Sequence, residues 1–142
     1  MRMPEPGLLL DTHCWLWLEF GESHRFTRAA RGVVERAARA GQLCVSIISV
    51  WEIGLLESKG RLELNLSCAE WVEQALATPG LSLLPLTTEI ALESSRLPGR
   101  CHGDPADRIL LATARITGAR FMTKDEKLLD YGQQQHAKVV PA

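Results

Sequence analysis

The feature that most constrains the fold is a short apolar run that ends on an acid. Residues 8–10 are three leucines, the next residue is Asp11, and a helical pattern follows at once. Such a run is typical of a buried strand, and a strand followed directly by a helix is a building unit of α/β proteins. Ligands of open parallel sheets bind outside the carboxyl ends of the strands. Asp11 is therefore expected at the functional edge of the sheet.

The rest of the chain repeats this alternation of strand and helix. We expect further strands at residues 43–46, 81–84, 120–123 and 137–140. We expect helices at residues 12–20, 26–40, 49–59, 68–77, 87–95, 105–117 and 125–131. The pattern predicts an α/β fold: a three-layer sandwich whose mostly parallel central sheet of roughly four to five strands has helices on both faces. The length of 142 residues suits a single domain spanning residues 1–142.

Composition and charge narrow the class of protein. With 46% hydrophobic and 23% charged residues, the chain has the composition of an ordinary globular protein. Its net charge is −1, so contact with nucleic acid must depend on a local basic patch or on bound cations. No apolar run is long enough to span a membrane, and the N-terminal apolar stretch lacks the cleavage site of a signal peptide. We therefore expect no membrane contact and a cytoplasmic location.

The cysteines and the absence of common motifs exclude several chemistries. The cysteines are scattered, with no Cys-x-x-Cys pair and no histidines at ligand spacing, which argues against a zinc site and against a disulfide framework. The glycine-rich loops that bind nucleotide phosphates are missing. The Gly-x-Ser-x-Gly turn of serine hydrolases is missing too.

Acids recur at equivalent positions of the alternation, beside strand ends and helix starts. The four are Asp11, Glu52, Asp107 and Asp125. In a parallel sheet these positions meet at one edge, so the carboxylates are expected in one crevice. Two unit charges about 4 Å apart repel by roughly 4 kcal/mol at an effective dielectric near 20, so such a cluster needs cations or protons. Mg²⁺ and Mn²⁺ prefer oxygen ligands and can activate water for phosphodiester hydrolysis.

Three of these acids also have a purely structural interpretation, because acids are favoured at helix N-termini. They match capping pairs at three helix starts: Ser49 with Glu52, Asp104 with Asp107, and Thr123 with Glu126. Asp11 is the one acid to which this interpretation assigns no capping role.

Two further groups have both a structural and a functional interpretation. His102 is either a surface or capping residue or a contact to substrate or metal. The basic residues Arg25, Arg28 and Arg31 begin a stretch that continues along the helix at 26–40. A solvated helix face is the simpler interpretation, and a surface for RNA phosphates or an acidic partner is the functional one.

Four segments carry a resemblance to a known family. They read LLLDTH at 8–13, VSIISVWEI at 45–53, HGDPADRILLATA at 102–114 and TKD at 123–125. In this order they resemble the PIN-domain ribonucleases, and more narrowly the VapC-like toxins of bacterial type II toxin–antitoxin systems. The matching segments span nearly the whole chain.

The resemblance implies a metal-dependent endoribonuclease that hydrolyses RNA. It implies that the catalytic residues are Asp11, Glu52, Asp107 and Asp125, and that Asp11, Asp107 and Asp125 bind Mg²⁺ or Mn²⁺. It implies accessory roles for Thr12, Thr123, Asp104 and His102. It further implies a homodimer and a cognate antitoxin whose tail covers the active site, in a complex of both proteins.

Two alternative functions remain open at this point. A PIN fold used for RNA processing, rather than as a toxin, would carry the same chemistry. A non-enzymatic receiver-like α/β binding module also places acids at strand ends, with a lysine that Lys124 would imitate. Such a module requires adjacent acids after the first strand, where this chain has Thr12 and His13.

Overall fold

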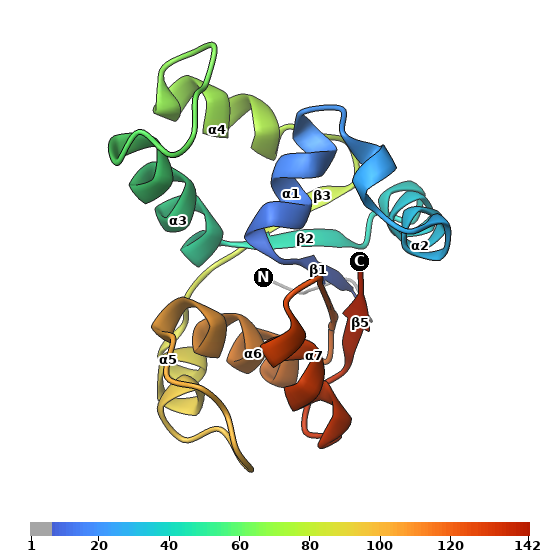
Figure 1. Cartoon of the computed structure of the whole chain (residues 1–142), viewed down its shortest axis with the longest axis vertical. Coiled ribbons are helices and arrows are strands. Elements are labelled where there is room, and N and C mark those ends of the chain that lie inside the picture. Colours follow the sequence, from blue (N-terminus) through green and yellow to red (C-terminus); the bar gives the residue numbers. More distant parts are fainter. Residues whose placement is uncertain (1–6) are drawn as a thin grey trace.

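A parallel sheet organises the computed structural model, which describes residues 7–142. Five strands lie in the order β3-β2-β1-β4-β5, and every neighbouring pair is parallel (Figure 1). The strands are β1 (Leu8–Leu10), β2 (Leu43–Ser46), β3 (Leu81–Leu84), β4 (Arg120–Thr123) and β5 (Val139–Pro141). The predicted α/β class and strand number are confirmed, and the sheet is entirely parallel.

The helices fall where the alternation predicted them, with one 3₁₀ turn in addition, η1 (Ser23–Arg25). They are α1 (Thr12–Glu19), α2 (Arg28–Arg39), α3 (Ile47–Ser58), α4 (Cys68–Leu76), α5 (Thr88–Ser95), α6 (Pro105–Thr117) and α7 (Glu126–Gln133). None of the described helices is both long and apolar enough to cross a lipid bilayer.

The helices cover both faces of the sheet, as expected for a three-layer sandwich. Leu8 and Leu10 of β1 belong to one hydrophobic core, with residues of α1 to α4. Leu9 belongs to the other core, with residues of α5, α6 and α7. Successive side chains of a strand point to opposite faces, so a run of three leucines serves both cores. Figure 1 shows the two groups of helices on either side of the strands.

The strand order places a topological switch point between β1 and β4. From β1 the chain moves outward to β2 and β3, and then returns to β4 on the other side of β1. In open α/β sheets the crevice at the carboxyl end of such a switch point is the usual ligand site. Asp11 follows β1 and Thr123 ends β4, so both lie at this crevice.

Two of the predicted capping pairs are wrong. Helix α3 begins at Ile47 and is capped by the hydroxyl of Ser46, which accepts from the backbone N–H of Ile48 at 3.0 Å. Ser49 therefore lies inside the helix, fully buried, and forms no capping box with Glu52. At α7 the cap is Asp125, not Thr123. Helix α3 begins directly after β2, closer to the strand than the local pattern indicated. Helix α7 begins farther from the end of β4 than that pattern indicated.

Candidate active site

The carboxylate of Asp11, at the junction of β1 and α1, accepts two hydrogen bonds. It is the N-cap of α1, and its Oδ1 accepts from the backbone N–H of Thr12 at 2.8 Å. Its Oδ2 accepts from the hydroxyl of Thr123 at 2.7 Å, and the residue is buried. The expectation that Asp11 has no capping role is therefore wrong. With no loop between β1 and α1, the residue that ends the strand must also cap the helix.

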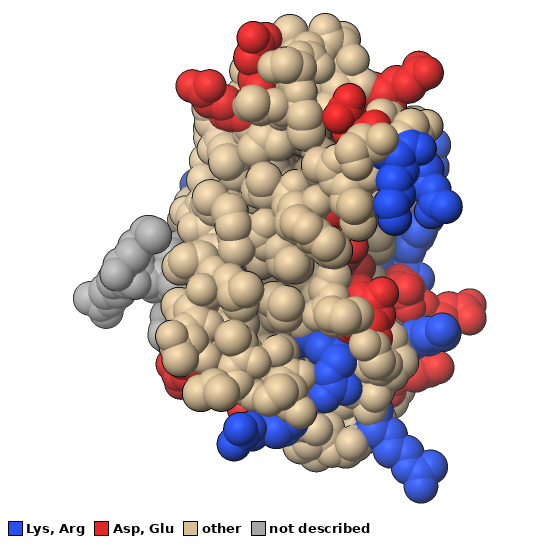
Figure 2. Space-filling model, turned by 90° about the vertical axis from the view of Figure 1, so that its left-hand side faces the viewer, with Lys and Arg blue, Asp and Glu red and all other residues tan. Residues whose placement is uncertain are grey.

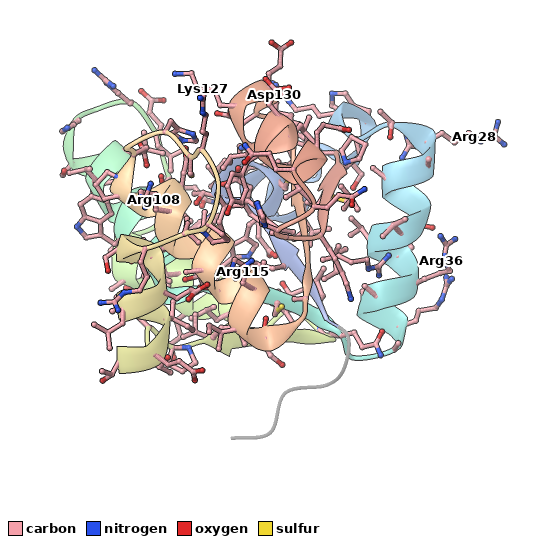
Figure 3. All side chains as sticks on the ribbon, turned by 90° about the horizontal axis from the view of Figure 1, so that it is seen from below. Arg28, Arg36, Arg108, Arg115, Lys127 and Asp130 are labelled. Carbon is pink, nitrogen blue, oxygen red and sulfur yellow. The ribbon has the colours of Figure 1, made fainter. Side chains whose placement is uncertain are left out.

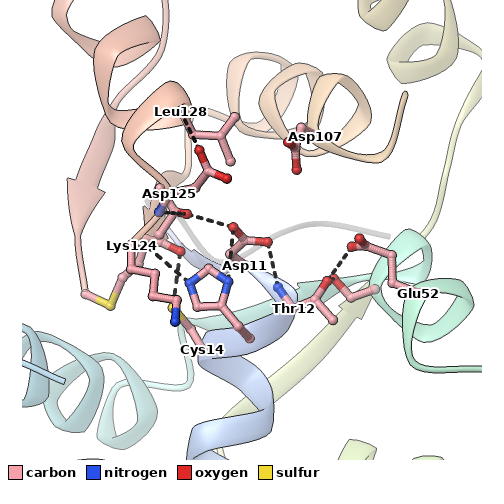
Figure 4. A network of polar contacts seen from close by, with 12 residues as sticks. Asp11, Thr12, Cys14, Glu52, Asp107, Lys124, Asp125 and Leu128 are labelled. Carbon is pink, nitrogen blue, oxygen red and sulfur yellow. Dashed lines mark hydrogen bonds and ion pairs between the residues drawn. The ribbon is translucent and has the colours of Figure 1, made fainter. Parts of the chain in front are cut away.

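Thr123 connects Asp11 to Asp125. While its hydroxyl donates to Asp11, the same oxygen accepts from the backbone N–H of Asp125 at 3.0 Å. Asp125 in turn caps α7, where its Oδ1 accepts from the N–H groups of Lys127 at 2.8 Å and Leu128 at 3.3 Å. This leaves Oδ2 of Asp125 without a hydrogen bond among the described residues, and therefore free to bind a ligand. Figure 4 shows this chain of contacts.

Glu52 approaches from α3, on the other side of Thr12. The Thr12 hydroxyl lies 2.5 Å from Oε1 of Glu52 and 2.8 Å from the hydroxyl of Ser49. The pKa of Glu52 is raised to about 7, mainly by burial; the hydrogen bond from Thr12 lowers it, and the charges of Asp11, Asp107 and Asp104 raise it. Glu52 thus binds a proton near neutral pH. It does not cap its helix.

Asp107 is placed by the start of α6. It occupies the third helical position, and its backbone N–H donates to Oδ1 of the N-cap Asp104 at 3.0 Å, as predicted. Its Oδ2 lies 2.8 Å from Nε2 of His102, so His102 contacts a candidate catalytic acid. Burial raises the pKa of Asp107, and the hydrogen bond from His102 lowers it. His102 thus stabilises the charged form of this carboxyl.

An open depression of about 540 Å³ joins several of these groups. Its lining consists of His13, His102, Asp104, Asp107, Lys124, Asp125, Glu126 and Lys127. Asp11 and Glu52 lie beside it, and Figure 4 shows the carboxylates of Asp125 and Glu52 on the two sides of Asp11, with that of Asp107 above. Arg25, Arg28 and Arg31 are not part of the lining; they lie on η1 and α2.

His13 and Lys124 were missed as site residues. Nε2 of His13 accepts from the backbone N–H of Lys124 at 3.2 Å, while Nδ1 lies 3.5 Å from Oδ2 of Asp11. This pairing requires a neutral ring, and burial lowers the pKa of His13, with Lys124 acting in the same direction and Asp11 against it. Nζ of Lys124 lies 5.2 Å from the ring centre of Trp17. The sequence signal was available, since His13 follows Asp11 by two residues and Lys124 precedes Asp125.

The donor set suits a hard divalent cation. Carboxylates and hydroxyls supply the oxygen ligands that Mg²⁺ prefers, and this ion usually keeps several waters and binds one or two carboxylates directly. Among residues 7–142, however, no three His, Cys, Asp or Glu side chains converge closely enough to form a complete metal cage. The residues therefore fit a metal that is bound in part through water and substrate.

Comparison with known proteins identifies the class of protein. The PIN domain family matches residues 8–133, which is most of the chain. The chain therefore belongs to the PIN domain family. It is similar to Ribonuclease VapC22 of Mycobacterium tuberculosis (strain ATCC 25618 / H37Rv), with 33% identity over 121 residues, 85% of this chain and 88% of that protein. The resemblance to VapC-like proteins is confirmed.

Solved structures support the same fold. VapBC2 of Rickettsia felis, bound to a promoter DNA fragment, matches 94% of this chain and 97% of that chain with a TM-score of 0.67 at 11% identity. The DNA-bound VapBC of Salmonella typhimurium covers 96% of this chain and 98% of that chain, with a TM-score of 0.66 at 13% identity. A toxin–antitoxin complex from Klebsiella pneumoniae covers 94% and 96%, with a TM-score of 0.59 at 20% identity.

Proposed function

We propose that this protein is a metal-dependent endoribonuclease that acts as the toxin of a type II toxin–antitoxin pair. The observation that carries the proposal is the meeting of Asp11, Glu52, Asp107 and Asp125 around one crevice at the switch point of a PIN-family sheet. Its VapC-like relative is named a ribonuclease, and the solved structures of similar fold are toxin–antitoxin complexes. RNA is therefore the substrate, and a small antitoxin is the partner.

In this proposal the acids divide into two roles. Asp11, Asp107 and Asp125 would hold Mg²⁺ or Mn²⁺, which lowers the pKa of bound water and neutralises charge on the phosphate. Glu52, with its pKa of about 7, is matched to accept a proton from water near neutral pH. The hydroxyls of Thr12 and Thr123 orient Glu52 and Asp11, and His102 orients Asp107.

Cleavage of a structured RNA by the purified protein tests this proposal. We expect cleavage with Mg²⁺ or Mn²⁺, none after chelation, and none for Asp11→Asn, because that variant removes a ligand charge from the crevice. Asparagine retains an oxygen that can accept from Thr12 N–H, so the melting temperature of the metal-free variant should stay within a few degrees of wild type. Cleavage that persists after both treatments would contradict the assignment.

Toxin use requires a separate experiment, because a processing nuclease would share the chemistry. Induced expression of the wild-type chain should stop bacterial growth, whereas Asp11→Asn should not. Co-expression of the adjacent short open reading frame should restore growth if it encodes the antitoxin. Cleavage in vitro with unaffected growth would assign the protein to RNA processing instead.

A further inference from the structure

Helix α2 presents a row of arginines that the active site does not use. We call Arg28, Arg31, Arg36 and Arg39 the α2 arginine ridge. All four side chains are exposed, while Ala30, Val34 and Ala37 on the opposite side of the helix are buried. At 100° per residue the four arginines fall on one outward face. Figure 3 shows Arg28 and Arg36 pointing away from the molecule.

The charge of this ridge is not neutralised by the fold. In the part of the chain that the structure describes, none of its four arginines forms an ion pair. The exposed Glu35 is the one acid of α2, so the helix carries a net charge of +3 in a chain whose net charge is −1. Arg25 differs, because its guanidinium forms an ion pair with the carboxylate of Glu22 at 2.8 Å. The unpaired part of the predicted basic surface is therefore the part on α2, and Arg25 does not belong to it.

Helix stability does not explain the whole ridge. Arg36 and Arg39 lie in the last turn, where positive charge complements the helix dipole. Arg28 is the first residue of the helix, where positive charge opposes the dipole, and the first turn contains no acid. In Figure 3, Arg28 lies toward the same edge of the molecule as Lys127, which lines the depression. The ridge thus begins at the same edge of the molecule as Lys127, at the other end of that edge in this view.

We infer that the α2 arginine ridge binds the phosphate backbone of the RNA whose scissile bond lies in the acidic crevice. This inference rests on the proposed function. The ridge extends about 17 Å from Arg28 to Arg39 at 1.5 Å per residue, enough to contact several phosphates. In the lining of the depression four acids outnumber Lys124 and Lys127, so without metal the crevice attracts phosphate weakly, whereas exposed guanidinium groups bind phosphate strongly.

The test measures binding apart from cleavage, in the Asp11→Asn background without metal. A fluorescent single-stranded RNA is titrated at several salt concentrations. Removing all four arginines (Arg28→Ala, Arg31→Ala, Arg36→Ala, Arg39→Ala) should reduce the slope of log K against log salt by about 3, at roughly 0.7 per phosphate contact. Affinity at 0.1 M salt should fall at least about tenfold. Alanine is a strong helix former, so α2 should persist, which circular dichroism checks.

A matched control removes the same charge from other exposed positions: Lys59→Ala, Arg61→Ala, Arg96→Ala and Lys138→Ala. It should retain most of the salt slope, because these residues do not lie on α2. Glu35→Gln raises the net positive charge of α2, so this variant should bind RNA more tightly, with a steeper salt slope.

Three outcomes would overturn the inference. One is an equal loss of slope in the ridge variant and the control, which would show a general charge effect. Another is unchanged RNA binding by the ridge variant. A third is unchanged RNA binding together with lost binding of a polyglutamate peptide, which would assign the ridge to an acidic partner. If the wild-type chain cleaves RNA in any of these cases, the proposed function stands and only the ridge is refuted.

Discussion

At the scale of single residues, Glu52 has the property most unusual for its type. It is partly buried between Thr12 and the other acids, and its carboxyl keeps its proton up to a pH of about 7 instead of 4.5. Because the raised pKa comes from burial and from like charges, the ionised form is a cost to the folded state. In the proposed mechanism the same property suits Glu52 to accept a proton at neutral pH.

Stability of the metal-free protein should therefore depend on pH through Glu52. Between pH 4.5 and about 7 the native state binds more protons than the unfolded state, so the free energy of unfolding falls as the pH rises. In Glu52→Gln this contribution is absent, and the variant should lose less stability between pH 5 and pH 8. Denaturant unfolding in a chelating buffer measures the difference. Glu57→Gln, an exposed change on the same helix, should follow wild type; parallel curves for wild type and Glu52→Gln would refute the prediction.

His13 is the second residue whose geometry makes a prediction. Its Nε2 accepts from the backbone N–H of Lys124 and so holds the turn that precedes Asp125. Glutamine can place its amide oxygen near the position of Nε2, whereas asparagine reaches only as far as Nδ1. We expect His13→Asn to lower kcat about tenfold, with little change in KM, and His13→Gln to retain most activity, since misplacing a catalytic group is costly.

Hydrogen exchange provides a readout for His13 that does not depend on activity. The amide of Lys124 should exchange faster in His13→Asn than in wild type or His13→Gln, because its acceptor is lost. His24→Asn changes an exposed histidine outside the depression and is the matched control. Equal exchange and equal kcat for the asparagine and glutamine variants at position 13 would show that the contact positions nothing.

At the scale of elements, the start of α3 decides what Glu52 can do. If Ser49 capped α3 in a capping box, the Glu52 side chain would point back to the backbone N–H of Ser49. Instead β2 ends on Ser46, which caps α3 itself, so Glu52 lies in the second turn and its side chain contacts Thr12 of α1. Ser49 then becomes a buried link between α3 and α1 through the Thr12 hydroxyl. A shift of the helix start by one turn thus converts a capping acid into a site acid.

At the scale of the whole molecule, one face is notable for its lack of charge. Figure 2 shows mostly uncharged residues on the side that carries α3 and α5. The large apolar side chains exposed on these elements include Trp51 at 56%, Leu92 at 54% and Leu86, in the loop before α5, at 42%. Ile47, Leu83, Pro85 and Leu86 line a further depression of about 510 Å³. An exposed apolar surface of this kind is typical of a protein–protein interface.

This face is where we expect the homodimer implied by the family resemblance. Leu86→Lys should place an unpaired charge in an apolar interface and shift the protein from dimer to monomer in analytical ultracentrifugation. Gln133→Lys adds the same charge to an exposed position on α7 and should remain dimeric. A dimer that survives Leu86→Lys at micromolar concentration would place the interface elsewhere.

The local pattern of the sequence was sufficient for the strands and helices, and it placed the candidate acids beside strand ends and helix starts. Strands and helix starts depend on residues a few positions apart, because the side-chain period and the capping hydrogen bonds are local. Examples are the apolar runs that end at Asp11 and Thr123, and the start of α6, which Asp104 caps. Strand and helix assignment therefore followed from the sequence, as did the residues that end β1 to β4.

Only the tertiary structure decided how these residues meet. The strand order that brings β4 beside β1 lets the Thr123 hydroxyl reach Asp11 across 112 positions of sequence. The contacts of Glu52 with Thr12, and of His13 with Lys124, span 40 and 111 positions. Such contacts, and the burial that raises the pKa of Glu52, depend on the packing of whole elements. No local pattern encodes them, because they form only when the helices pack on the two faces of the sheet.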